Sequence, residues 1–294
     1  MIAAIQSPRP PHSRVSSGTD LGCLRNFLSN RFVYVLVSPR AKGLSMGINV
    51  NPDKQCNFNC AYCEVDRRIP GEPILEIETM AAELQSTLQL VRSGELLRQP
   101  AYQKLTPELA QLRHVALSGD GEPTISEKFL DVVQTVIHLR AKNTVPFFKV
   151  VLITNASRLA DDTVCAALSL FTTQDDIWAK LDGGSQAYLN QVNAPDLPLE
   201  QILSNIASVA QVRPIVIQSL FPLLNGEGPD AFEISAYIDR LKSLQQRAAK
   251  ISLVQIYSAN RPPANHRCGH LSLKALSSIA QAVRRETGLN AQVF

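Results

Sequence analysis

Three cysteines lie close together in one short segment, the run Cys56-Asn57-Phe58-Asn59-Cys60-Ala61-Tyr62-Cys63. Their spacing is C-x3-C-x2-C, and an aromatic residue directly precedes the last cysteine. Thiolates in a loop this short can all reach one iron-sulfur cluster, with each sulfur bound to a different iron. A cubic cluster held by three thiolates leaves one iron without a protein ligand, and a small molecule can bind there, as at a catalytic metal site. The spacing therefore predicts a reactive metal centre on Cys56, Cys60 and Cys63.

Other uses of these cysteines remain open. Structural zinc usually has four protein ligands, often supplied as two C-x2-C pairs, and no second pair follows at a suitable spacing. A non-catalytic metal-binding module would use the cysteines without any cofactor site beside them. A disulfide framework fits less well, because six cysteines in 294 residues are sparse and no signal peptide precedes them. We therefore expect free thiols in a reducing, cytoplasmic setting.

The composition is that of an enzyme-sized globular protein. With 294 residues, of which 45% are hydrophobic and 19% charged, the chain is long enough for one large α/β domain of the barrel type. The net charge of +3, from 29 basic and 26 acidic residues, is too small to indicate nucleic-acid binding by itself. No apolar run approaches the roughly 20 residues that span a bilayer, so we expect no membrane insertion.

The first residues differ from the rest of the chain. Pro8, Pro10 and Pro11 surround Arg9, and several serines lie nearby. Such a segment cannot bury enough apolar surface to order itself. We predict a disordered tail over residues 1–31 and one core domain over residues 32–294. The tail is compatible with a transit peptide and equally with translation from an upstream start.

Beyond the tail, β-branched apolar runs alternate with helical stretches, as in parallel strands joined by crossover helices. Six such strands are expected at 44–50, 114–118, 149–154, 177–181, 214–220 and 252–257, with an extra strand at 32–37. Helices are expected at 77–97, 127–142, 161–171, 199–209, 231–248 and 272–287. Six β/α units predict an α/β fold, a partial (β/α)6 barrel with one open side. Its chemistry is expected in the loops that follow the carboxyl ends of the strands.

Over roughly residues 43–261 the chain resembles the radical SAM superfamily, whose members bind a 4Fe-4S cluster through C-x3-C-x2-C after the first strand of a partial barrel. The resemblance implies that Cys56, Cys60 and Cys63 hold the cluster and that S-adenosylmethionine chelates its open iron. It also implies reductive cleavage to a 5'-deoxyadenosyl radical, which abstracts hydrogen from a substrate that the sequence does not identify. A reductant such as flavodoxin or ferredoxin is an expected partner. The protein's part is to hold the cofactor and shield the radical.

The second expected strand ends in a glycine-rich turn that contains Gly121, Glu122 and Pro123. Glycine lets the backbone approach a ligand closely, and the carboxylate can accept an ammonium group. The turn is similar to the family's G-E-P segment beside the methionine amino group. An ordinary turn with a helix cap at Thr124 or Ser126 is the alternative.

Polar residues also end the third and fourth strands. Thr154, Asn155 and Ser157 resemble the family's ribose-contacting position, although Asn155 would also suit an Asx turn. Lys180 is placed to neutralise the cofactor's carboxylate. Alternatively, Lys180 pairs only with Asp182, two residues further on.

The last two strands carry Gln218, Gln255 and Tyr257. Strand alternation places Gln255 and Tyr257 on one face. If that face lines the barrel, Gln218 and Gln255 need a ligand or another polar partner, because a buried polar group without one is costly.

Three segments resemble a branch of the superfamily that includes tRNA wyosine-base synthetases: S-G-D-G-E-P-T, K-L-D-G-G followed by Tyr188 and Asn193, and V-Q-I-Y-S-A-N-R-P-P. That branch carries a second cluster on cysteines upstream of the main motif, and here only Cys23 lies upstream. A tRNA substrate is therefore retained only as an alternative. Cys165 is expected to pack in the core. Cys268 follows the sixth strand near the barrel mouth, where its thiol would be a candidate hydrogen-atom donor to a substrate radical.

Overall fold

The computed structural model describes residues 27–38, 40–71, 74–142, 147–259 and 267–294. Within these ranges the chain forms an eight-stranded sheet in the order β1-β2-β3-β4-β5-β6-β8-β10. The strands are β1 (Val33–Ser38), β2 (Gly43–Asn49), β3 (Leu112–Ser118), β4 (Lys149–Thr154), β5 (Asp176–Lys180), β6 (Ile215–Leu220), β8 (Ile251–Tyr257) and β10 (Ala291–Val293). The main helices are α1 (Ile77–Arg92), α2 (Phe129–Ala141), α3 (Asp162–Ser169), α4 (Gln186–Val192), α5 (Leu199–Val212), α6 (Ala231–Gln246) and α7 (Leu273–Thr287).

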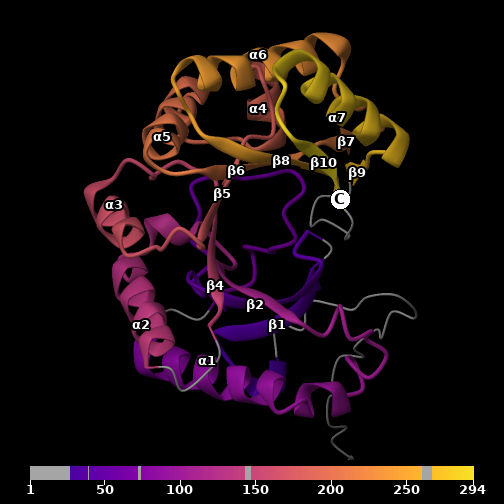
Figure 1. Ribbon diagram of the computed structural model, residues 1–294. Coiled ribbons are helices and arrows are strands. Elements are labelled where there is room, and N and C mark those ends of the chain that lie inside the picture. The colour runs from indigo at the N-terminus through magenta and orange to yellow at the C-terminus, as the bar shows by residue number, and fades with distance from the viewer. Residues whose placement is uncertain (1–26, 39, 72–73, 143–146, 260–266) are drawn as a thin grey trace, which may run out of the picture.

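The sheet is parallel from β2 through β10, and β1 runs antiparallel to β2 at one edge. Its strands follow an arc, with the helices on the outer side (Figure 1). The two ends of the arc, β1 and β10, are not neighbours in the strand order, so the barrel is open. All six strands predicted for the barrel are confirmed as β2 to β6 and β8, and the extra strand is β1.

Both faces of the central strands are covered. In β6, for example, all residues from Ile215 to Leu220 are buried. Parallel strands packed on both faces are near-continuous apolar runs, which is why the sequence marks them clearly. The inner face has its own small apolar cluster, formed by Val151, Trp178 and Val216.

The structure differs from the sequence prediction at several short elements. Helix α1 ends at Arg92, because Gly94 adopts a left-handed φ of 76° where the prediction continued to residue 97. Helix α4, β10 and the antiparallel pair β7 (Pro222–Leu224) and β9 (Cys268–His270) were not predicted. Each spans at most seven residues, too few to show a clear hydrophobic period.

The folded body begins earlier than the sequence predicts. Phe27 is buried and lies edge-on to Tyr102, with 6.2 Å between the ring centroids. The side-chain amide of Asn30 donates to Thr87 Oγ1 of α1 at 3.1 Å. Residues 27–31 therefore pack on the domain instead of extending a tail. Residues 1–26 of the predicted tail lie outside the described residues.

Among the described helices, none is both long and apolar enough to cross a membrane.

A buried ion pair joins α2 to the segment that directly precedes β5. Arg140 of α2 donates to both carboxylate oxygens of Asp175, at 2.6 and 3.0 Å. Asp175 also accepts the backbone N–H groups of Val150 and Thr172, at 2.8 and 2.7 Å. Burial by itself raises the pKa of Asp175, but these hydrogen bonds together outweigh it and hold the pKa below its ordinary value.

We predict that Asp175→Asn lowers the free energy of unfolding by about 3–5 kcal/mol, because it leaves the buried charge of Arg140 without its partner. Since the folded pKa of Asp175 is depressed, its contribution is present above pH about 4 and is lost as the pH falls through the lower, folded value. The variant should therefore lose less stability on acidification than the wild type. Urea unfolding followed by circular dichroism at several pH values measures both effects.

The matched control is Asp176→Asn, one residue further along. Asp176 pairs with Lys149, and the two side chains are 30% and 36% exposed. Exposed pairs contribute about 0–1 kcal/mol. Equal destabilisation by the two variants would contradict the assignment of Asp175 as the buried link.

Candidate functional site

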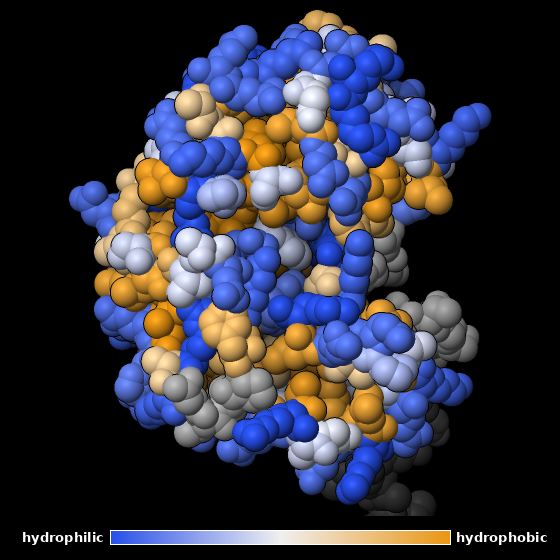
Figure 2. All heavy atoms as spheres, viewed as in Figure 1, coloured by the Kyte–Doolittle hydropathy of each residue, from blue (hydrophilic) through white to orange (hydrophobic). Residues whose placement is uncertain are grey.

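A cavity of about 710 Å³ lies on the concave side of the sheet. Figure 2 shows the surface hollowed between the part that carries α6 and α7 and the part that carries β1 and α1. The cavity is bounded by the loops after β2, β3 and β4, by the end of β5 and by Tyr257 at the end of β8. These are carboxyl ends of parallel strands, where α/β barrels place their chemistry.

Most of the predicted site residues line this cavity. Those that do are Cys56, Cys60, Cys63, Gly121, Glu122, Thr154, Asn155 and Lys180. Among the described residues, Pro123, Ser157 and Cys268 do not belong to the lining.

The cysteine loop, residues 51–71, contains no helix or strand and is fastened by contacts with distant segments. Backbone N–H groups of Asn59 and Ala61 donate to the carbonyls of Asn193 and Val192, at 2.9 and 2.7 Å. On its other side, the N–H of Glu122 donates to the carbonyl of Gln55 at 3.0 Å. The loop is therefore held between the end of α4 and the turn after β3.

The three thiols are free and half-buried, and all face the cavity. Burial raises the pKa of Cys60 to about 12, and the pKa of Cys56 is also raised, chiefly by burial. Without a metal, Cys60 is thus a neutral thiol at pH 7, and metal binding would have to displace its proton. Among the described side chains, no group of three His, Cys, Asp or Glu is arranged to hold a metal ion.

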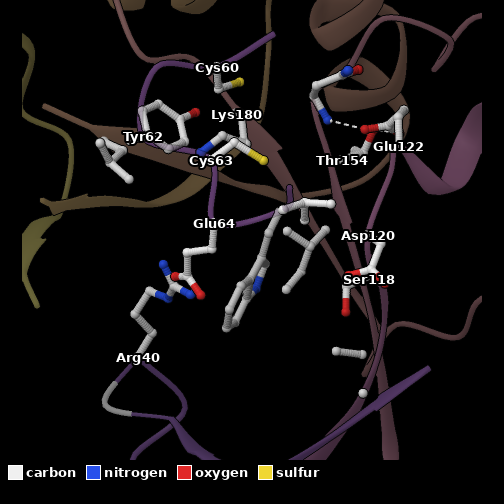
Figure 3. Close-up of a pocket in the computed structure, with 18 of the residues that line it drawn as sticks. Arg40, Cys60, Tyr62, Cys63, Glu64, Ser118, Asp120, Glu122, Thr154 and Lys180 are labelled. Atoms are coloured by element: carbon white, nitrogen blue, oxygen red, sulfur yellow. Dashed lines mark hydrogen bonds between the residues drawn. The ribbon is translucent and has the colours of Figure 1, made fainter. Parts of the chain in front are cut away.

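Three free thiols in one loop, directed into one cavity, fit the donor set of an iron-sulfur cluster. In such a cluster each thiolate binds a different iron, so the sulfurs need not converge on a single ion. Figure 3 shows Cys60 and Cys63 at one end of the cavity, beside Tyr62 and Lys180.

Glu122 joins the ends of β3 and β4. Its Oε1 accepts the hydroxyls of Thr124 and Thr154 at 2.6 and 2.5 Å, and its Oε2 accepts the N–H of Asn155 at 2.7 Å. Figure 3 shows Glu122 beside Thr154. Burial raises its pKa, and these hydrogen bonds oppose the rise. The sequence offered a helix cap at Thr124 or Ser126 as an alternative, but in the structure Glu122 caps the short 3-10 helix Pro123–Ile125. A carboxylate accepts about four hydrogen bonds, so Oε2 keeps capacity for a ligand.

Gly121 is required because the cysteine loop packs directly against it. A Cβ at this position would lie 1.7 Å from the carbonyl oxygen of Gln55 and 2.7 Å from Cβ of Asn51. The sequence prediction gave the glycine a role in approaching a ligand. The structure adds a second role, because only glycine lets the turn after β3 dock on the cysteine loop, and the approach to a ligand stays a prediction.

Asn155 and Ser157 also contact the cysteine loop. The amide of Asn155 donates to Asn57 Oδ1 at 2.9 Å, and the hydroxyl of Ser157 donates to the same oxygen at 3.3 Å. Asn155 Oδ1 accepts the N–H of Ser157 at 2.9 Å, which confirms the Asx turn offered as an alternative. Their contact with a ribose stays a prediction.

Lys180 lies between an acidic and an aromatic neighbour. Its Nζ is 3.4 Å from Asp182 Oδ2 and donates to the hydroxyl of Tyr257 at 3.1 Å. The ammonium group also lies 4.9 Å from the centre of the Tyr62 ring. Burial alone lowers the pKa of Lys180, but Asp182, Tyr257 and Cys60 together raise it above its ordinary value. The pairing with Asp182 is confirmed, and Lys180 nevertheless faces the cavity.

Gln218 and Gln255 satisfy each other. Both are buried, and the amide of Gln218 donates to Gln255 Oε1 at 2.8 Å. Neither lines the cavity among the described residues, whereas Tyr257, on the same face of β8, does. The polar partner that the sequence analysis expected for each glutamine is thus the glutamine on the neighbouring strand.

The other cysteines lie away from the motif. Cys165 is exposed on α3, so the prediction that it packs in the core is wrong. An eight-residue amphipathic helix leaves little margin for assigning its buried face from sequence. Cys268 is buried in β9, where it is paired in register with Leu224. Cys23 lies outside the described residues.

Several cavity residues were missed. The Arg40 guanidinium carbon lies 4.4 Å from the centre of the Tyr257 ring, and Figure 3 shows the Arg40 side chain beside Glu64.

His114 and Ser45 also line the cavity and were missed; His114 Nε2 lies 2.8 Å from Ser45 Oγ. Burial, then Lys149 and Arg40, lower the pKa of His114 to about 4, so it is neutral at pH 7. Inward-facing polar residues on β2 and β3 were the only signal in the sequence.

Relatives that share part of the sequence include two UPF0026 proteins. A UPF0026 protein of Helicobacter pylori strain J99 is 25% identical over 236 residues, which cover 79% of this chain and 68% of the relative. A UPF0026 protein of Synechocystis sp. is 31% identical over 182 residues, which cover 61% of this chain and 59% of the relative. No family model matches the chain.

Solved structures show the same fold. Streptococcus suis SuiB bound to its precursor peptide SuiA superposes with a TM-score of 0.58 at 13% identity, covering 88% of this chain and 50% of SuiB. SuiB bound to S-adenosylmethionine gives 0.57. A spore photoproduct lyase mutant gives 0.56 at 10% identity, covering 96% of this chain and 87% of the lyase. This chain therefore spans about half the length of SuiB. Its partial, open barrel matches radical SAM enzyme structures, which confirms the predicted fold class.

We predict that Gly121→Ala separates the turn after β3 from the cysteine loop, because its Cβ overlaps the Gln55 carbonyl. Overpacking of this kind costs about 1–3 kcal/mol and occasionally more. The displaced loop should also expose Cys60, which would react faster with an alkylating reagent under native conditions. Urea unfolding and mass spectrometry of the alkylated peptide measure the two effects.

Gly269→Ala is the control. A Cβ there meets only Leu223 side-chain atoms at 3.5 and 3.7 Å, ordinary contact distances. We expect its stability within about 0.5 kcal/mol of the wild type and unchanged alkylation. Unchanged alkylation of Cys60 in Gly121→Ala would show that the glycine does not hold the loop.

Proposed function

We propose that this protein is a radical SAM enzyme, with a 4Fe-4S cluster on Cys56, Cys60 and Cys63. The observation that carries the proposal is the convergence of three free thiols from one loop on a cavity at the carboxyl ends of the barrel strands. The fold it shares with SuiB, which has been crystallised with S-adenosylmethionine, supports the proposal. When bound, the cluster supplies the electron that cleaves S-adenosylmethionine to methionine and a 5'-deoxyadenosyl radical.

The chain's own residues would bind and orient the cofactor. The Lys180 ammonium faces the cavity beside the cysteine loop and can attract a carboxylate. Oε2 of Glu122, on another wall, can accept a hydrogen bond from an ammonium group. Thr154 and Asn155 line the cavity next to Glu122, within reach of a ligand's hydroxyls. In these assignments the carboxylate of the cofactor's methionine part faces the Lys180 ammonium, and its ammonium group faces the Glu122 carboxylate.

The substrate would occupy the part of the cavity beyond the cofactor. Its walls there combine neutral hydrogen-bonding groups, Ser45 and His114, with the aromatic face of Trp178, and Arg40 lies at Tyr257. A flavodoxin or ferredoxin would be the reductant. No contact of the described residues favours tRNA or peptide over a small molecule, so the reaction on the substrate is proposed only as hydrogen abstraction.

Cys268 has no place in this proposal, because it is buried in β9 and does not line the cavity. A hydrogen-atom donor has to reach the substrate radical.

We predict that Cys56→Ala, Cys60→Ala and Cys63→Ala each abolish 4Fe-4S assembly and S-adenosylmethionine cleavage, since each thiolate binds a separate iron. Anaerobic reconstitution followed by visible spectroscopy, iron and sulfide analysis and chromatography of 5'-deoxyadenosine makes the measurement. Cys165→Ala, which removes an exposed thiol on α3, is the control and should leave both readouts unchanged.

A wild-type protein that binds zinc with high affinity and forms no 5'-deoxyadenosine would refute the proposal and favour a non-catalytic metal-binding module.

A further inference from the structure

The side chain of Asn193 contacts the cysteine loop from the end of α4. Its Nδ2 lies 3.3 Å from Cys60 Sγ, 3.0 Å from the hydroxyl of Tyr62 and 2.8 Å from Asp182 Oδ2. The Tyr62 hydroxyl also donates to Asp182 Oδ2. Asn193 is buried, and its Oδ1 has no hydrogen-bond partner among the described residues. The two N–H groups of this amide thus lie within hydrogen-bond distance of three acceptors from two separate segments, so one N–H is shared between two of them.

Asp182 determines which way this amide points. Its Oδ1 accepts the N–H of Leu220 at 2.8 Å, and its Oδ2 faces Lys180 at 3.4 Å, so both oxygens act as hydrogen-bond acceptors. The carbonyl end of the Asn193 amide would be repelled there. The NH2 end must therefore face Asp182, and this orientation leaves Nδ2, rather than Oδ1, within hydrogen-bond distance of Cys60 Sγ. Lys180 offsets the negative charge that Asp182 would otherwise place beside the sulfur.

We propose that Asn193 is a positioning residue for the iron-sulfur centre, which fixes Cys60 and raises the reduction potential of the cluster through an N–H···S hydrogen bond. This inference rests on the proposed function. A donor to a coordinating sulfur stabilises the reduced cluster more than the oxidised one, because reduction adds negative charge. Hydrogen bonds to sulfur are among the factors that set the potentials of iron-sulfur proteins.

The backbone of the same residue serves a separate purpose. The carbonyl of Asn193 accepts the N–H of Asn59, and this bond does not depend on the side chain. A substitution at this position can therefore remove the N–H···S contact and leave the backbone anchor in place.

The test compares the wild type with Asn193→Leu, which removes the amide at similar volume. After anaerobic reconstitution, potentiometric titration followed by electron paramagnetic resonance gives the reduction potential of each protein. We expect the equilibrium constant for one-electron reduction to fall about tenfold in the variant, which corresponds to a potential lower by about 59 mV. A purely structural role would change stability without moving the potential.

The matched control is Asn205→Leu. Asn205 is also buried, and its amide donates only to the carbonyls of Ala156 and Ser157, at 3.1 and 2.7 Å. It should lose stability and keep the wild-type potential. An Asn193→Leu protein with a cluster of unchanged potential would overturn the inference and leave the proposed function intact. A wild type that assembles no cluster would instead overturn both.

If Asn193→Leu assembles no cluster, a measurement on the wild type decides. The protein is produced with asparagine labelled with nitrogen-15 at the side-chain amide, and its reduced cluster is studied by pulsed electron paramagnetic resonance. We expect a hyperfine coupling from an asparagine amide nitrogen, since Nδ2 of Asn193 lies 3.3 Å from Cys60 Sγ. Absence of that coupling would overturn the inference.

Discussion

The site depends on the docking of a loop without secondary structure onto the ends of the barrel strands. Buried backbone groups need hydrogen-bond partners, and a loop cannot supply all of them internally. In this protein they come from both sides, from Asn193 and Val192 after β5 and from Glu122 after β3. Gly121 makes the second contact possible, because any side chain would overlap Gln55. The positions of the three thiols thus follow from contacts with segments far away in the chain.

The polar groups around the loop act as one connected set. Glu122 links the ends of β3 and β4, and Asn155 donates both to Glu122 through its backbone N–H and to Asn57 through its side-chain amide. On the other side of the loop, Asp182 contacts Lys180 and Asn193. Glu122, Asn155, Asp182 and Asn193 are buried, where an unpaired charge or amide is costly. The network explains why residues that the sequence suggested as ligand contacts are largely occupied with the protein itself. Capacity that still faces the cavity includes Oε2 of Glu122 and the ammonium of Lys180.

The sequence predicts well what depends on local pattern. The six barrel strands were found because doubly covered parallel strands are continuous apolar runs, and the cysteine motif was found because its three members lie within eight residues. The contacts that build the site were not predictable in this way. Asn193 and Cys60 are 133 residues apart, and Asn155 and Asn57 are 98 apart. Only the fold brings them together, because the sequence patterns that contain Asn155 and Asn193 do not indicate a contact with the cysteine loop. Cys165 shows the same limit, because eight helical residues do not fix which face is buried.

In the proposed function, S-adenosylmethionine binds directly to an iron of a cluster held by the cysteine loop. Electron paramagnetic resonance of the reduced, reconstituted protein, recorded with and without S-adenosylmethionine, tests it most directly. The account predicts a 4Fe-4S signal whose g values change when the cofactor is added, because its donor atoms enter the coordination sphere of one iron. A cluster signal that is identical in the two samples would contradict it.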